Sequence, residues 1–162
     1  MQDFFKRYIP EFVYGAVDGT VTTFAVVAAS AGAGISSSVI LILGIANLIA
    51  DGFSMGSSAY LAASAEHEES VRDTQKRSSP KIIGAVTFLA FVVVGSVPVL
   101  PYLIDVIANL KAPNAVLFYV SSALTAATFL AIGFIKGKVS KQSPWQSAGI
   151  TLLLGAIAAG LA

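Results

Sequence analysis

Apolar residues run along the chain in five long stretches, separated by short polar connections. Each stretch is close to the ~20 residues that an α-helix needs to cross ~30 Å of hydrocarbon. Pro80, Pro113 and Pro144 stand where the last three stretches begin, and proline is favoured at helix starts. We therefore predict an all-α polytopic membrane protein with five transmembrane helices in a single domain, residues 1–162. The predicted spans are 11–30, 37–64, 81–103, 114–135 and 144–162.

Composition strengthens the membrane assignment. Of the 162 residues, 56% are hydrophobic and 12% are charged, and the mean hydropathy is +0.79. A soluble domain of this size cannot bury so much apolar surface. The absence of cysteine excludes disulfides, iron–sulfur clusters and thiolate zinc sites. Charged Glu11 follows the start too soon for the apolar part of a signal peptide, so no cleaved segment is expected.

Basic residues predict the orientation. Nine of the ten Lys and Arg residues fall on one side if the five spans alternate in direction, and only Lys111 falls on the other. Because basic loops stay in the cytoplasm, we expect a cytoplasmic N-terminus and a C-terminus outside or in a lumen. A bacterial protein of this kind would lie in the plasma membrane, and a eukaryotic one in a vacuole-type membrane.

Two carboxylates lie inside the predicted spans, Asp18 in the first and Asp51 in the second. Neither span contains a Lys or Arg to pair with them. A charge in hydrocarbon costs ~2.5–3.5 kcal/mol on insertion scales, and such residues usually mark an ion or proton pathway. The alternative is that both acids are protonated or turned toward polar neighbours as structural residues.

Further polar residues share a helix face with each acid. These residues can all act as metal ligands. They are Asn47 and Met55, on the same face as Asp51 in the second span, and Glu11 and Thr22, on the same face as Asp18 in the first. A short connection favours antiparallel packing, which would place Asp18 level with Met55 and Thr22 near Asp51. Oxygen ligands with a thioether favour iron or a similar transition metal over magnesium or calcium. Ordinary packing is the alternative for Met55.

The second stretch is about 42 Å long as a helix, more than the bilayer needs. We expect its end to project into the cytoplasm and to carry Glu66, Glu68 and Glu69. These acids are either a solvated helix end or a site that concentrates cations at the mouth of the pathway.

Glycine pairs flank both acids. Gly15 and Gly19 surround Asp18, and Gly52 and Gly56 follow Asp51, each pair spaced as G-x-x-x-G. This spacing permits close helix contact. We expect the contact to help the metal ligands converge, either within one chain or across a dimer axis.

Four segments resemble the vacuolar iron transporter family: YGAVDGTVTTFAVVAASAGAG, ILGIANLIADGFSMGSSAYLAASAEHE, ALTAATFLAIGFIKGKVS and TLLLGAIAAGLA. The resemblance implies five-helix subunits in a homodimer with a conduction path between them. It implies export of iron(II), and sometimes manganese(II), from the cytosol in exchange for protons. The family's metal-path positions fall on Asp18 and Met55. A family acid is replaced by Asn47, and Asp51 supplies a carboxylate one turn along.

One departure from the family concerns the connection after the second span. Many members carry a glutamate-rich helical cytoplasmic domain there, whereas about sixteen residues, 65–80, join the two spans in this chain. That length is too short for a helical bundle, so no metal-storing domain is expected.

These observations predict a divalent metal transporter with no permanently bound cofactor, whose partners are the bilayer, metal ions, protons and a second copy. A manganese(II) or broad divalent exporter remains an alternative, as does a non-conducting membrane scaffold. An enzyme is not expected, because the chain has no Ser/His/Asp set, no phosphate-binding glycine loop and one histidine. Nucleic acid is not an expected partner, because no basic stripe is present.

Overall fold

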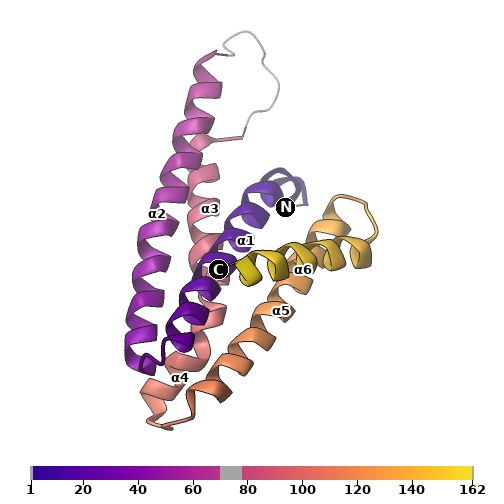
Figure 1. Cartoon of the computed structure of the whole chain (residues 1–162). Helices are drawn as coiled ribbons and strands as arrows, with labels where there is room; N and C mark the ends of the chain where they lie inside the picture. The colour runs from indigo at the N-terminus through magenta and orange to yellow at the C-terminus, as the bar shows by residue number, and fades with distance from the viewer. Residues whose placement is uncertain (1, 70–77, 162) are drawn as a thin grey trace.

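The computed structural model describes residues 2–69 and 78–161, which fold into six α-helices and one short 3-10 helix (Figure 1). No strand occurs within these ranges. The elements are α1 (Gln2–Gly32), α2 (Ser37–Glu69), α3 (Pro80–Gly95), η1 (Val97–Val99), α4 (Leu100–Ala108), α5 (Asn114–Val139) and α6 (Pro144–Leu161).

Four helical segments are long and apolar enough to cross a membrane, which confirms an all-helical, multi-pass membrane protein. Among the described residues, these segments are Arg7–Gly32, Ser37–Glu66, Pro80–Ala108 and Asn114–Val139. The fifth predicted span forms α6, which has 18 residues and is not one of the four. At 1.5 Å per residue, α6 is about 27 Å long, slightly less than the hydrocarbon core. The five-span count is therefore not confirmed.

The first helix begins earlier than predicted. The expected start at Glu11 follows Pro10, but α1 continues through this proline from Gln2. Proline inside a helix removes one backbone hydrogen bond and crowds the preceding turn. Near this end of α1, the buried hydroxyl of Tyr8 accepts a hydrogen bond from the Ser79 N–H at 3.2 Å, which ties α1 to the start of α3.

The third span is interrupted, so the predicted continuous helix over 81–103 was wrong in this respect. Helix α3 ends at Gly95, η1 follows, and α4 carries the chain on to Ala108. Pro98 and Pro101 cause the break, because neither has a backbone N–H to continue the helical ladder. The Pro98 carbonyl instead accepts a hydrogen bond from the buried Ser121 hydroxyl at 2.7 Å, and α5 is thereby joined to the break.

Helix α3 packs against both α1 and α2, and the glycines make this packing possible. A Cβ on Gly19 would lie 2.5 Å from the Phe91 carbonyl oxygen of α3. A Cβ on Gly56 would lie 2.9 Å from the Gly84 carbonyl oxygen, also on α3. The close helix contact predicted from the G-x-x-x-G spacing is therefore present, but it is made with α3 and not between the two acid-bearing helices.

Helix α6 turns back beside α5 (Figure 1). Gly133 and Gly137 of α5 allow the approach, since a Cβ on either would lie 2.6–2.7 Å from the α6 backbone at Ala148 or Pro144. At the other end of α5, a buried cluster joins four helices and η1. Its members are Val27, Ile40, Val99, Tyr102 and Leu117.

Candidate functional site

Asp18 and Asp51 line the same cleft, although they come from different helices. The cleft has a volume of about 280 Å³ and is also lined by Tyr14, Ser54, Met55 and Ser58. Asp18 is half-buried on α1, whereas Asp51 is exposed on α2. The structure therefore brings together three of the residues singled out from the sequence: two carboxylates and the Met55 thioether.

The two acids lack a basic partner. In the described ranges, neither carboxylate takes part in an ion pair or accepts a hydrogen bond, and the charge of Asp51 acts repulsively on Asp18. Two carboxylates that face one cleft are stabilised in the charged state by a cation between them. The arrangement is therefore suited to a mobile cation or to protons.

Asn47 and Thr22 form a polar layer one helical turn from the acids. The Asn47 side-chain amide donates to the Thr22 hydroxyl at 3.4 Å and to the Thr23 hydroxyl at 3.3 Å. The Thr22 hydroxyl itself donates to the Asp18 backbone carbonyl at 3.0 Å. Thr22 was predicted to lie near Asp51, and its hydrogen-bonding partner on α2 is Asn47, one helical turn from Asp51. This layer joins α1 to α2 and does not line the cleft.

Glu11 lies outside the cleft, seven residues or about 10 Å from Asp18 along α1. Its Oε2 atom is buried and has no hydrogen-bond partner in the structure as described. Burying a polar atom without a hydrogen-bond partner costs free energy, so a proton or a cation at Glu11 would stabilise its carboxyl group. Glu11 thus remains a candidate ligand on the same helix, in a separate position.

The acidic end of α2 is distant from the cleft. Glu66 is exposed and lies eleven residues, or about 16 Å, beyond Met55 along the helix. The side chains of Glu68 and Glu69 lie outside the part of the chain that the structure describes. No group of three or more His, Cys, Asp or Glu residues that would hold a metal occurs among the described residues.

Asp105 is a further acid within a candidate span, Pro80–Ala108, and it lies beyond the predicted end of that span at residue 103. It is 7% exposed, and its carboxylate accepts a hydrogen bond from the Ala112 N–H at 2.9 Å. Asn109 and Lys111 adopt positive φ angles in the turn that Asp105 holds. The sequence signal for this role is an acid shortly before the Asn109–Lys111 turn. Asp105 accepts a backbone hydrogen bond that closes the turn, so its role is structural.

Comparison with known proteins identifies the family. The VIT family model matches residues 9–79 and 67–162, which together cover most of the chain. The chain belongs to the VIT family. This result confirms the resemblance drawn from the sequence motifs and agrees with the prediction that the protein is not an enzyme.

Several relatives of this chain are named as vacuolar iron transporters, and they differ in how much of their length the match covers. The chain is 46% identical to the vacuolar iron transporter of Toxoplasma gondii over 61 residues, which are 38% of this chain and 20% of that protein. A match to the Plasmodium berghei protein covers 26% of that relative. Vacuolar iron transporter 1 of Eucalyptus grandis is 28% identical over 213 aligned positions, covering 95% of this chain and 83% of the relative. The first two matches thus span only about a quarter or less of those relatives.

The longer alignments extend over more positions than this chain has residues. An alignment of 213 positions exceeds the 162 residues of this chain, so the plant VIT protein has at least 51 positions without a counterpart here. The family model matches in two parts that overlap at 67–79, a range that begins in the last turn of α2. The absence of an additional domain between α2 and α3 remains a prediction.

Proposed function

We propose that this VIT family protein transports divalent transition-metal ions across a membrane, with iron(II) as the first candidate. The observation that carries the proposal is the cleft in which Asp18 and Asp51 face each other without a basic partner. Two adjacent candidate spans supply these acids, which supports a site within the membrane region. The names of the related vacuolar iron transporters support the choice of metal.

The composition of the cleft favours a transition metal over magnesium or calcium. Asp18 and Asp51 contribute carboxylate oxygens, Ser54 and Ser58 contribute hydroxyls, and Met55 contributes a softer thioether sulfur. Manganese(II) requires the same kinds of oxygen ligand, so a manganese or broad divalent exporter is the nearest alternative. Competition between iron(II) and manganese(II) in one assay distinguishes them.

Exchange of metal for protons follows from the ligand chemistry. Carboxylates must be deprotonated to bind a metal ion, so metal binding releases protons. Metal that arrives from the cytosol displaces protons from Asp18 and Asp51, and protons that arrive from the other side displace the metal. If the cleft opens to one side of the membrane at a time, this competition couples metal export to proton entry.

The proposed topology has five crossings, with α6 as the fifth, a cytoplasmic N-terminus and the opposite side for the C-terminus. The proposed assembly is a homodimer, because the cleft of one chain contains only two acids and has the 64% exposed Tyr14 at its edge. A second copy against this face would complete the coordination of the ion.

The proposed membrane is the plasma membrane in a bacterium or a vacuole-type membrane in a eukaryote.

Transport into proteoliposomes with an imposed pH gradient tests the proposal. Asp18→Asn and Asp51→Asn should each reduce uptake of iron(II) or manganese(II) at least about tenfold, because each removes an anionic ligand. Asp105→Asn is the matched control: it removes an acid from a span but keeps an oxygen that accepts the Ala112 N–H. Normal transport by both cleft variants would refute the proposed roles. A folded protein that neither binds nor transports metal would indicate the scaffold alternative.

A further inference from the structure

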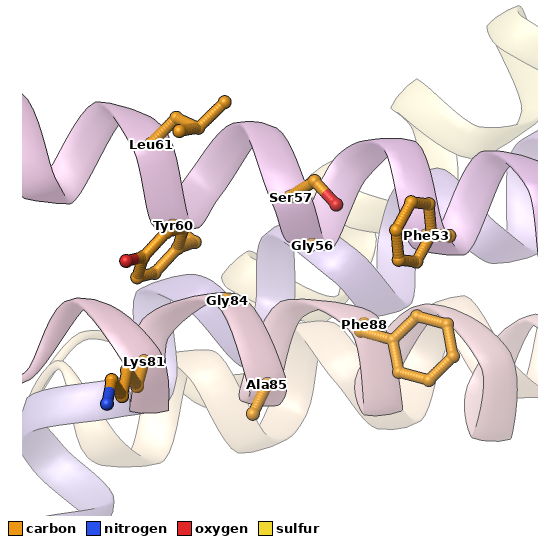
Figure 2. A pocket seen from close by; sticks show the side chains of 9 residues that line it. All are labelled: Phe53, Gly56, Ser57, Tyr60, Leu61, Lys81, Gly84, Ala85 and Phe88. Carbon is orange, nitrogen blue, oxygen red and sulfur yellow. The ribbon is translucent and has the colours of Figure 1, made fainter.

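A second concave surface lies between α2 and α3, separate from the acidic cleft. Its floor is the close contact between Gly56 and Gly84, and its volume is about 570 Å³ (Figure 2). The walls belong to two candidate membrane spans, Ser37–Glu66 and Pro80–Ala108. Lipid chains are therefore the surrounding solvent of this groove, which we call the α2–α3 groove.

The α2–α3 groove has a polar end and an apolar end. Figure 2 shows the Lys81 side chain and the Tyr60 hydroxyl at one end, and the rings of Phe53 and Phe88 at the other. Phe53 is 68% exposed, so its ring is available to a molecule in the groove. Lys81 is exposed and forms no ion pair with any residue in the described ranges. The groove thus combines an unpaired cation with aromatic walls.

The depth of each end matches the two parts of a phospholipid. Lys81 is the second residue of α3, so it lies where this span begins, at the level of headgroups. The positive end of the α3 dipole lies at the same level. Phe53 and Phe88 are each seven residues deeper than Tyr60 and Lys81, respectively, or about 10 Å into the hydrocarbon. The nearest acid with a described side chain further along α2 is Glu66, about 9 Å beyond Tyr60.

We propose that the α2–α3 groove binds an anionic phospholipid of the cytoplasmic leaflet. The phosphate contacts the Lys81 ammonium, and one acyl chain lies over the Gly56–Gly84 contact between Phe53 and Phe88. The negative surface potential of that leaflet provides such lipids at the depth of Lys81. From the proposed function this inference takes only the orientation of the chain, and no residue of the acidic cleft takes part.

Native mass spectrometry of the whole chain, titrated with phosphatidylglycerol or with phosphatidylcholine of the same acyl chains, tests the headgroup contact. The wild type should bind phosphatidylglycerol about fivefold more tightly, the ratio expected for one basic residue at an anionic lipid. Lys81→Ala should remove this preference, and Lys81→Arg should keep it. Lys136→Ala, which removes another exposed lysine, should also keep it. A preference that survives Lys81→Ala overturns the proposal.

A second pair of variants tests the acyl-chain contact. Ala85 is exposed and lines the groove, so Ala85→Trp adds an indole ring on its α3 side. It should weaken binding of both lipids about tenfold, the equivalent of two methylene groups left unburied. Leu130→Trp, at a 40% exposed position on α5, is the control and should change nothing. Unchanged lipid binding in Ala85→Trp overturns the proposal, as does a change of oligomeric state in that variant, because the occupant would then be a second copy.

The lipid result and the transport result are separable. Asp18→Asn should bind lipid like the wild type even if it abolishes transport, because the cleft and the groove share no lining residue. Glycerophosphate, which carries the charge without acyl chains, should not displace bound lipid. Displacement by glycerophosphate overturns the proposal, because an anion site alone would then explain the binding.

Discussion

Replacing Gly19 with alanine tests the packing that holds the acidic cleft together. Gly19 follows Asp18 on α1 and faces α3, where an added Cβ would lie 2.5 Å from the Phe91 carbonyl oxygen and 3.0 Å from its Cα. Both atoms belong to the α3 backbone, so they cannot move aside as a flexible side chain does. The added methyl group must therefore push α1 away from α3.

The expected effect is a moderate loss of stability. Overpacking of a close contact costs about 1–3 kcal/mol, and the better helix propensity of alanine offsets up to about 1 kcal/mol. A net loss of about 1–2 kcal/mol corresponds to a fall in Tm of roughly 2–8 °C for a chain of this size. Thermal unfolding of the purified protein in one detergent measures this shift.

Gly149→Ala is the matched control for Gly19→Ala. Gly149 also lies within a helix, but a Cβ there would have no atom within 4 Å. This variant should leave Tm unchanged or raise it by up to about 4 °C, since only helix propensity changes. If Gly19→Ala proved as stable as Gly149→Ala, the close contact between α1 and α3 would be refuted.

Three further results are expected. Asn47→Leu should lower the free energy of unfolding by about 1–2 kcal/mol in denaturant titrations, because it removes two hydrogen bonds, to Thr22 and Thr23. An unchanged midpoint would exclude a role for this layer in joining α1 to α2. Asp105→Ala should lower Tm while metal binding persists, because it leaves the Ala112 N–H without its acceptor; loss of metal binding in a folded variant would contradict a purely structural role. Manganese(II) affinity measured by calorimetry should fall as pH decreases, about tenfold per pH unit for each proton that binding releases; a pH-independent affinity would argue against proton exchange.

The hydrophobic pattern predicted most of the fold. The starts of α2, α5 and α6 at Ser37, Asn114 and Pro144 agree with the predicted boundaries. The break after Gly95 was not predicted, because the apolar stretch continues through Pro98 and the span was drawn from hydropathy alone. The glycine spacing is visible in the sequence, but the sequence does not show which helix packs against those glycines. Which helix packs against a small-residue face depends on the whole bundle, and local periodicity does not determine it.

The candidate site was predictable to a similar degree. Helical spacing placed Asp51 and Met55 on one face, and the short α1–α2 connection placed Asp18 opposite them, as found in the cleft. The pairing of Asn47 with Thr22 was not predictable, because a shift of one turn in the register between helices changes the partner. Whether these residues bind metal remains a prediction that the transport and binding assays address.

The glycine contacts of α3 also constrain how the protein can move. Where one backbone rests directly on another, as at Gly56 and Gly84, there are no side chains whose rotamers can rearrange to allow a new spacing. Helices α1, α2 and α3 should therefore move as one rigid body in any conformational change. Any alternation of access to the cleft must then arise at the outer borders of this unit, by its sliding against α5 or against a second copy.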